Sequence, residues 1–268
     1  MLMRRVFCLL PVLASSALVP LIHAATLYPA YWAESSTDAS GNYNYNLPLA
    51  TGSIGGPLSG SIPTDASSGS PGNDLVNYFR TDTDLAGTAY DGSLLGNLSG
   101  ATSLTATFSI NDSALDPGAP FDASDIIGSN AGIRLMFMGG YLGDGTPNEW
   151  WSNPTAAYVT SMNNGQSVTL TVAFDPSLWS NYYGHVGNSG AEYTTEFGDA
   201  LTGVTRLGLS FGSGDFFSNG FGVDTGGNAS IQLDSIGTTS STPEPSTFGI
   251  LAGALAAMAA LRRKATRS

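Results

Sequence analysis

The feature that most constrains the fold is an alternation of apolar and polar residues that recurs in several short segments. In residues 103–110, four apolar residues alternate with Ser and Thr, and residues 168–174 repeat the pattern around Thr169 and Thr171. Successive side chains of a β-strand point to opposite faces, so a period of two predicts strands with one buried face. Further segments with this signal or a shorter form of it cover residues 76–79, 133–137, 207–211 and 231–233.

Turn sequences such as "NDSALDPG", "GDGTPN" and "MNNGQ" separate these segments, and Asn164-Gly165 is typical of a tight hairpin. Many spaced strands over residues 73–238 predict an all-β domain, a two-sheet antiparallel β-sandwich. One exception is residues 191–201, where Tyr193, Phe197 and Leu201 recur every four positions. That spacing predicts one short helix.

The N-terminal residues 1–24 have the layout of a secretory signal, with an early basic pair, an apolar stretch and a small-residue end. The only cysteine, Cys8, lies inside this predicted signal helix. Residues 25–72 form a Ser/Gly-rich segment with few groups able to stabilise a core, and we expect part of it to be a loosely held approach to the sandwich. Trp32 is expected to dock there as part of an extra strand.

Charge is distributed very unevenly. Residues 25–242 hold three arginines against 20 acidic residues, a formal charge of −17, whereas the whole chain carries −12. Such a surface repels phosphate backbones, which excludes nucleic acid as a plausible partner. It favours divalent cations instead, because calcium takes oxygen ligands from carboxylates, amides and carbonyls.

The C-terminal segment, residues 239–268, reverses this charge pattern. Residues 248–261 are 14 uncharged residues, which as a helix would be about 21 Å long. Arg262, Arg263 and Lys264 can extend the apolar length by placing their charged groups at the membrane interface. We therefore predict a transmembrane helix in the inner membrane, with the basic tail inside and the acidic body outside.

These C-terminal features, in this order, resemble the PEP-CTERM sorting signal of surface proteins of Gram-negative bacteria. The residues that carry the resemblance are Pro243, Glu244 and Pro245, and after the apolar run Arg262, Arg263 and Lys264. The resemblance implies processing by exosortase, a membrane enzyme, and an association with exopolysaccharide and the biofilm matrix. A sorting signal supplies an address and leaves the activity open.

A second resemblance lies in the body. The phrase "LTGVTRLGLSFG", followed by "ASIQLDSIG", is similar to the last strands of galactose-binding-like and laminin-IV-like jelly-roll modules. This resemblance implies a jelly-roll-like sandwich, a structural calcium ion and sugar binding. It places a calcium ligand at Asp234, to which we add Asn73 and Asp74 from an early loop. Aspartates that only cap their own turns are the alternative interpretation.

Aromatic residues in segments rich in Asn and Ser suggest contact with a glycan, because an aromatic face beside amides and hydroxyls suits a pyranose ring. The candidate residues are Trp150, Trp151, Trp179 and Tyr182, with Tyr183 beside them. Adjacent tryptophans on an extended segment point to opposite sides, which would leave one exposed. The alternative is that these tryptophans belong to the core.

The sequence gives weaker evidence for catalysis than for metal or glycan binding. "GLSFG" matches a nucleophile elbow in composition only, since Ser210 falls within an alternating strand, where we expect it to face solvent. Glu149, Glu192, Glu196 and Asp175 could supply paired carboxylates, although pairs arise by chance in so acidic a chain. The last two glutamates, four residues apart, are equally expected on the solvated face of the helix.

The sequence therefore predicts a non-catalytic protein that is exported, anchored in the membrane by its C-terminal helix, and then held at the cell surface or released. Its sandwich would bind calcium or polysaccharide, or build the matrix. A secreted glycan-active enzyme, either a glycoside hydrolase or a lyase, is the alternative function.

Overall fold

The computed structural model describes residues 21–37, 43–48, 51–63, 75–83, 94–127, 132–153, 156–212 and 220–240. Apart from Leu21, they belong to one compact unit, Ile22–Ser240. The predicted C-terminal helix and residues 1–20 of the predicted signal helix lie outside the described residues. The last four residues of the predicted signal form a strand, β1.

The first sheet has six strands in the order β12-β7-β16-β5-β4, with β1 also paired to β16. Its long strands β7 and β16 pair antiparallel, as do β7 and β12. The strands are β1 Leu21–Ala24, β4 Thr51–Gly52, β5 Leu58–Ile62, β7 Ala101–Asp112, β12 Val168–Ala173 and β16 Ala229–Ser240.

The second sheet has eight strands in the order β13-β10-β9-β14-β6-β2-β3, with β11 also paired to β9. The pairings of β14 with β9 and β6 are antiparallel. The strands are β2 Ala33–Thr37, β3 Tyr43–Pro48, β6 Leu75–Asp82, β9 Gly132–Tyr141, β10 Pro147–Ser152, β11 Ala157–Tyr158, β13 Trp179–Asn181 and β14 Arg206–Phe211.

A small two-stranded sheet and the helices complete the described unit. These elements are β8 Ile126–Ile127 and β15 Gly222–Val223, the α-helix α1 Ala191–Thr202, and the 3-10 helices Pro29–Tyr31, Ala123–Asp125, Val159–Ser161 and Pro176–Leu178.

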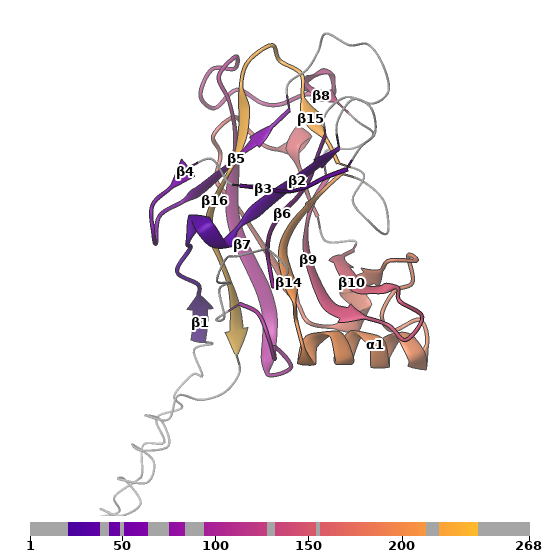
Figure 1. Cartoon of the computed structure of the whole chain (residues 1–268). Coiled ribbons are helices and arrows are strands. Elements are labelled where there is room, and N and C mark those ends of the chain that lie inside the picture. Colours follow the sequence, from indigo (N-terminus) through magenta and orange to yellow (C-terminus); the bar gives the residue numbers. More distant parts are fainter. Residues whose placement is uncertain are drawn as a thin grey trace, which may run out of the picture. The chain divides into compact units, whose positions relative to one another are not determined.

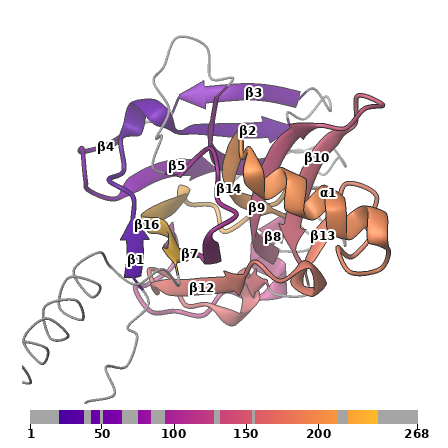
Figure 2. The same ribbon diagram turned by 90° about the horizontal axis from the view of Figure 1, so that it is seen from below.

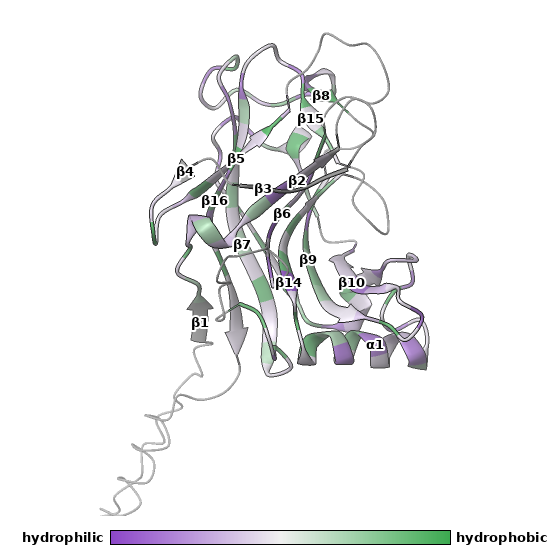
Figure 3. Ribbon diagram, in the orientation of Figure 1, coloured by the Kyte–Doolittle hydropathy of each residue, from purple (hydrophilic) through white to green (hydrophobic). Residues whose placement is uncertain are grey.

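The two large sheets form a sandwich, and the predicted all-β, antiparallel, jelly-roll-like class is confirmed (Figure 1). The strands of both sheets mix hydrophobic and hydrophilic residues along their length (Figure 3). In β7 the predicted inward residues Leu104, Ala106, Phe108 and Ile110 are all fully buried. The alternation therefore identified the core face of this strand correctly.

Strands β9 and β10 depart from the expected pattern because both of their faces are buried. In β9 the residues on the core face, such as Leu135 and Phe137, alternate with Arg134 and Met136, which are buried as well. Met136 belongs to a second, small cluster with Tyr78 and Trp151. At β9 and β10 the eight-stranded sheet is thus covered on both sides, which a period of two does not predict.

The helix α1 confirms the expectation for residues 191–201. Phe197 and Leu201 are buried against the core and Tyr193 is partly buried beside them. The helix lies at one end of the sandwich and contacts β9 and β10 (Figures 1 and 2). It approaches β9 at Gly139, where an added Cβ would lie 2.2 Å from the Cα of Ala200. Glycine is needed there so that helix and strand can pack this closely.

The described parts of the Ser/Gly-rich segment belong to the sandwich. Its described strands extend both sheets, since β2 pairs with β6 and β5 pairs with β16. Trp32 is buried with its ring centroid 5.7 Å from that of Phe79. Backbone pairing and this aromatic contact explain why a segment poor in apolar residues is nonetheless part of the sandwich.

The Asn164-Gly165 turn forms, but it does not join a hairpin. Gln166 N donates to Asn163 O at 2.8 Å, and Gly165 has a φ of +75°. Asn163 bridges to Pro120, whereas β12 after the turn pairs with β7. The local turn chemistry was predicted correctly, while the partners on each side are set by tertiary pairing.

Candidate functional site

The three tryptophans predicted to contact a glycan are fully buried, so that prediction is wrong for all three side chains. Trp150, Trp151 and Trp179 each have 0% exposure. Trp150 packs edge-on against Phe197 in the main core, while Trp151 lies in the cluster on the opposite face of the sheet. The two do point to opposite sides, but because both faces of β10 are covered, neither is available for a sugar.

Each indole instead has an internal hydrogen-bond acceptor. Trp150 Nε1 donates to Asn148 Oδ1 at 2.8 Å, and Trp179 Nε1 donates to the carbonyl of Ala173 at 2.7 Å. Trp151 Nε1 donates to Oγ of Ser210 at 3.0 Å. Ser210 is therefore a buried acceptor, contrary to the expectation that it faces solvent.

Two exposed tyrosines lie on the loop from Asn181 to His185, which we call the aromatic loop. Tyr182 is 37% and Tyr183 is 56% exposed, and their rings meet edge to face with centroids 5.6 Å apart. The hydroxyls of Tyr183 and Thr146 are hydrogen-bonded at 2.9 Å. The loop thus presents a pair of aromatic rings, and Thr146 in the turn between β9 and β10 holds one of them, Tyr183, by a hydrogen bond.

Asn181 holds the backbone of the aromatic loop. Its side-chain Oδ1 accepts hydrogen bonds from the amides of Tyr183 and His185, each at 3.0 Å. Gly184 N donates to the carbonyl of Asn181, and Gly184 has a φ of +81°. The His185 ring stacks on Tyr193 of α1 with centroids 4.4 Å apart. These contacts hold the loop backbone on both sides of the two tyrosines.

The sequence indicated only some of the residues that form this surface. The repeated tyrosines of "SNYYGH" indicated Tyr182 and Tyr183, but Thr146 was visible only as part of a turn. Tyr141 is 64% exposed and pairs with Pro147, the residue after Thr146. Pairing between β9 and β10 brings it to this end of the sheet, and no local pattern predicts that pairing.

Buried charges form an ion cluster of Arg80, Asp82, Arg206 and Glu149 on the face of the eight-stranded sheet that is turned away from the main core. Arg206 Nε and Arg80 Nε donate to the same Asp82 Oδ2, at 2.6 and 3.2 Å. Arg206 Nη1 lies 3.7 Å from Glu149 Oε1. Burial raises the pKa of Glu149 to about 7, against the opposing effect of Arg206 and Arg80.

The three arginines of residues 25–242 all share this face. Arg80, Arg134 and Arg206 lie on the neighbouring strands β6, β9 and β14, in registers that put them on one side of the sheet. Arg80 also contacts the Ser35 hydroxyl and lies with its guanidinium carbon 5.6 Å from the centre of the Tyr78 ring. The positive charge of the body is thus concentrated in one buried region.

The other candidate carboxylates lie apart from Glu149 in the fold. On α1, Glu192 is exposed and Glu196 is partly exposed. Burial and the nearby charge of Glu192 raise the pKa of Glu196. Asp175 caps the 3-10 helix Pro176–Leu178, where hydrogen bonds from Ser177 lower its pKa. Glu149 on β10 is itself buried, so among the described residues it forms no carboxylate pair with them around an open cleft.

The predicted calcium ligands are only partly described. Asp234 accepts hydrogen bonds from Gln232 Nε2 at 2.7 Å and from Ser167 Oγ at 3.3 Å. Asn73 and Asp74 lie outside the described residues. Within the parts of the chain that the structure describes, no group of three or more His, Cys, Asp or Glu side chains gathers as a metal site.

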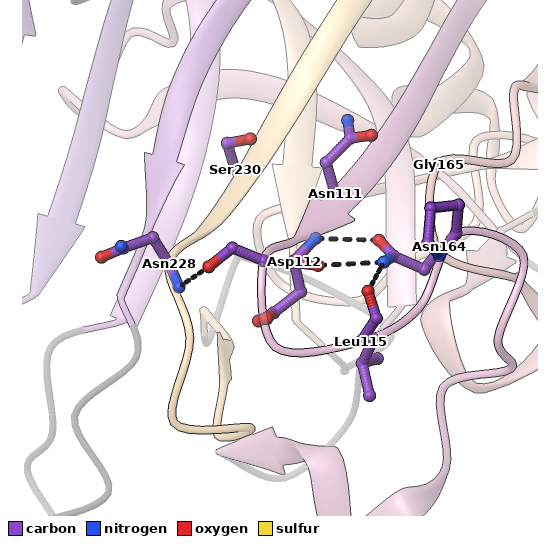
Figure 4. Close-up of a pocket in the computed structure, with 9 residues that line it drawn as sticks. Asn111, Asp112, Leu115, Asn164, Gly165, Asn228 and Ser230 are labelled. Atoms are coloured by element: carbon purple, nitrogen blue, oxygen red, sulfur yellow. Dashed lines mark hydrogen bonds between the residues drawn. The ribbon is translucent and has the colours of Figure 1, made fainter.

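A cavity of about 450 Å³, here called the Asp112 pocket, lies where β7 ends and β16 begins (Figure 4). Six of its nine lining residues carry a side-chain oxygen. The lining residues are Asn111, Asp112, Ser113, Leu115, Pro117, Asn164, Gly165, Asn228 and Ser230. No sequence motif marks this pocket, although Asp112 continues the inward register of Ile110 and thus places a carboxylate on a core-facing position.

The fold makes this an all-β sandwich protein, and the C-terminal residues show that it carries a signal for export. Residues 241–264 match the PEP-CTERM protein-sorting motif, which confirms the predicted resemblance. The motif indicates export, C-terminal membrane anchoring before processing, and processing by exosortase, a membrane enzyme. Among the described residues, no helix has the length and apolarity to cross a bilayer.

No curated protein matches the chain. Among solved structures, it is similar to the L4b domain of human laminin alpha-2, with 10% identity, a TM-score of 0.41 and coverage of 83% of this chain and 98% of that domain. The xylan-binding module CBM15 has 11% identity, a TM-score of 0.32 and coverage of 80% and 97%. An alginate lyase, A1-II′, has 15% identity, a TM-score of 0.31 and coverage of 79% and 95%.

Proposed function

We propose that this protein is an exosortase-sorted component of the cell surface or extracellular matrix whose sandwich binds polysaccharide without catalysis. The sorting motif supports the first half, because it gives the chain an address outside the cytoplasm. The aromatic loop supports the second half, because it is the described surface on which two adjacent aromatic rings reach solvent.

The single observation that carries glycan binding is the fixed, exposed pair Tyr182 and Tyr183. Exposed aromatic rings gain nothing from the core, yet here Asn181 and Thr146 hold them in position by hydrogen bonds. Aromatic faces bordered by hydroxyl and amide groups suit the apolar faces and hydroxyls of sugar rings. Hydrogen bonds that hold the loop in one conformation reduce the entropy lost when a sugar stacks on it.

A glycan-active enzyme would need a carboxylate that substrate can reach. Glu149 is 4% exposed, and its charge is already opposed by Arg206. A general acid needs a raised pKa, which Glu149 has, but it must also lie within hydrogen-bond reach of the scissile bond. We therefore take the raised pKa as a consequence of burial in the ion cluster and propose a non-catalytic protein.

Affinity electrophoresis of the full-length protein in detergent, through gels containing neutral or uronate-bearing polysaccharides, tests binding. We expect retardation in at least one gel, and the Tyr183→Ala variant should bind about tenfold more weakly, since about 1.4 kcal/mol corresponds to a factor of ten. Tyr158→Ala is the matched control, because Tyr158 is 44% exposed but pairs with Gly132 at the far end of β9, about 30 Å along the strand.

The outcomes separate the hypotheses. Equal retardation of Tyr183→Ala and Tyr158→Ala would contradict a binding role for the aromatic loop. Release of reducing ends or unsaturated products, abolished by Glu149→Gln, would show the alternative enzyme. Absence of both retention and release across the polysaccharides would leave only a matrix-building role and overturn the binding proposal.

Sorting is tested by the mass of the protein recovered outside the cell. We expect a product that lacks both the N-terminal signal and the residues beyond the Pro243-Glu244-Pro245 element. In cells without exosortase, the chain should retain its C-terminal segment and stay with the membrane fraction. An identical mass in both strains would contradict processing by that enzyme.

A further inference from the structure

The cations of the body are all withdrawn from its surface. Residues 25–242 contain no lysine and only three arginines, all of them among the described residues. Arg80 and Arg134 are 2% and 4% exposed, and the side chain of Arg206, 18% exposed, is held by Asp82. Because Arg and Lys are the side chains that bind carboxylate and phosphate groups, the described part of the body has no exposed Lys or Arg for an acidic glycan.

A carboxylate instead lies next to the aromatic loop. Thr146 connects the two, because its hydroxyl is hydrogen-bonded to the Tyr183 hydroxyl at 2.9 Å and its amide donates to Asp144 Oδ1, also at 2.9 Å. Asp144 is exposed in the turn between β9 and β10. Hydrogen bonds from the amide and the hydroxyl of Thr146 lower the pKa of Asp144, so its carboxylate is ionised at neutral pH.

Helix α1 brings two further carboxylates to the same place. It contacts β10, and β10 pairs with β13, from which the aromatic loop continues (Figure 2). The His185 ring of the loop stacks on Tyr193, which lies between Glu192 and Glu196 in the sequence. Burial and the charges of Glu192 and Asp144 raise the pKa of Glu196, and His185 opposes them. All three of these groups therefore lie within electrostatic range of Glu196.

These carboxylates are spread around the loop. Among the described residues, no three His, Cys, Asp or Glu side chains come together as a metal site. A single small ion would therefore not be shared by them. An extended ligand with several separate positive charges can instead meet them one at a time, while its rings stack on the tyrosines.

We propose that the aromatic loop selects a glycan whose sugars carry protonated amino groups over neutral and uronate-bearing glycans. This inference rests on the proposed glycan binding at Tyr182 and Tyr183 and names the class of sugar. An ammonium group gains from both parts of the surface, because an aromatic ring attracts a cation placed over its face and exposed carboxylates attract it as well. A uronate would be repelled by Asp144 and the helix glutamates, with no exposed Lys or Arg to compensate.

The expected preference is modest and depends on salt. Ion pairs at exposed positions are weak, and salt screens them over about 10 Å at 0.1 M and about 3 Å at 1 M. We expect an aminated oligosaccharide to bind about three- to tenfold more tightly than its neutral counterpart in dilute salt. The difference should disappear at about 1 M salt.

Calorimetric titration of the full-length protein in detergent measures this preference. The probes are oligosaccharides of equal length, namely an oligomer of glucosamine, its fully N-acetylated form and an oligomer of galacturonate. The pH is chosen so that the amines are protonated and Asp144 is ionised. The N-acetylated oligomer keeps the sugar rings and removes their charge, so the ratio of these two affinities isolates the charge effect. Tyr183→Ala should weaken the binding of both, and we expect the galacturonate oligomer to bind most weakly.

Variants distinguish this site from a general attraction to an acidic protein. Asp144→Asn and Glu196→Gln should each lower the ratio of amine to N-acetyl affinity about two- to threefold, and the new amide at position 144 can still accept from Thr146 N. Asp116→Asn is the matched control, because it removes a charge from an exposed position beyond the far end of the 12-residue strand β7. The near end of β7 lies beside the end of α1, where Leu98 N donates to Leu201 O at 2.7 Å. The control should leave the ratio unchanged.

The outcomes separate this inference from the proposed function. Equal affinity for the aminated and N-acetylated oligomers, both weakened by Tyr183→Ala, would overturn the selectivity and leave glycan binding at the loop intact. Tighter binding of the galacturonate oligomer would do the same. An amine preference that survives Tyr183→Ala, or that falls equally in Asp116→Asn and Asp144→Asn, would show general attraction to the acidic body and also overturn the inference. Binding of none of the probes would contradict both.

Discussion

Nε of Arg206 donates a hydrogen bond of 2.6 Å to Oδ2 of Asp82, although the two residues are 124 positions apart in the chain. They are directly opposite each other on β14 and β6, in the register that also pairs Leu209 with Phe79. A single cross-strand register therefore places an ion pair on one face of the sheet and a core contact on the other.

Removing Asp82 should be costly, because the carboxylate holds the buried guanidinium of Arg80 and the partly buried guanidinium of Arg206. We expect Asp82→Asn to lower the free energy of unfolding by on the order of 3 kcal/mol, since breaking a buried pair leaves an uncompensated charge. Urea denaturation followed by tryptophan fluorescence measures this loss. Asp199→Asn, at an exposed position of α1, should stay within about 0.5 kcal/mol of the parent, and equal losses would contradict the role of the cluster.

Stability should decrease as the pH rises from about 4.5 to about 7. Burial raises the pKa of Glu34 and of Glu149 to about 7, so across this window the folded state binds more protons than the unfolded chain. Each glutamate contributes on the order of 3 kcal/mol that is fully present below pH 4.5 and lost as the pH passes 7. Asp122 and Asp144 have lowered pKa values and titrate below this window.

Thermal melts at pH 5, 6, 7 and 8 measure this dependence. Glu34→Gln should be flatter across the window and more stable than the parent at pH 8, because the amide cannot ionise in the core. A parent protein whose midpoint rises with pH between 5 and 7 would show that the two glutamates are not held neutral by burial.

Two glycine-to-alanine changes should have opposite signs. Gly139→Ala should destabilise by about 1–3 kcal/mol, because the new methyl group meets the backbone of Ala200 and α1 must shift. Gly198→Ala, on the exposed face of α1 with nothing within 4 Å, should stabilise by about 1 kcal/mol through helix propensity. Denaturant titrations of both variants check the packing of the helix, and a neutral Gly139→Ala would contradict it.

Ser210→Ala should cost about 1–3 kcal/mol, because the buried Nε1 of Trp151 loses its acceptor. Adding Trp151→Phe to this variant removes the stranded donor, so the double variant should lose less than the sum of the two single changes. Strict additivity in the unfolding free energies would indicate that the hydrogen bond contributes nothing.

The sequence predicted single elements correctly but did not predict which side chains are exposed. The alternation from Leu104 to Ile110 predicted a strand and its buried face, and the spacing of Phe197 and Leu201 predicted the helix. Both predictions succeeded because the periodicity of a single element depends only on its own residues. The tryptophans were misplaced since exposure depends on what covers each face of β10, and that cover comes from elsewhere in the chain. The sequence indicated the two tyrosines of the aromatic loop, but it gave no sign that Asn181 and Thr146 hold them by hydrogen bonds.

By itself, the sequence determined strongly periodic elements such as β7, β12 and α1, the acidic character of the body and the sorting motif at residues 241–264, because these depend on local spacing and composition. Only the tertiary structure decided that three arginines share one sheet face and that Asp112 lies in a pocket with Asn164, 52 positions away. Strand order joins distant segments through backbone hydrogen bonds that every residue except proline can make in full, so no local pattern encodes which strands meet.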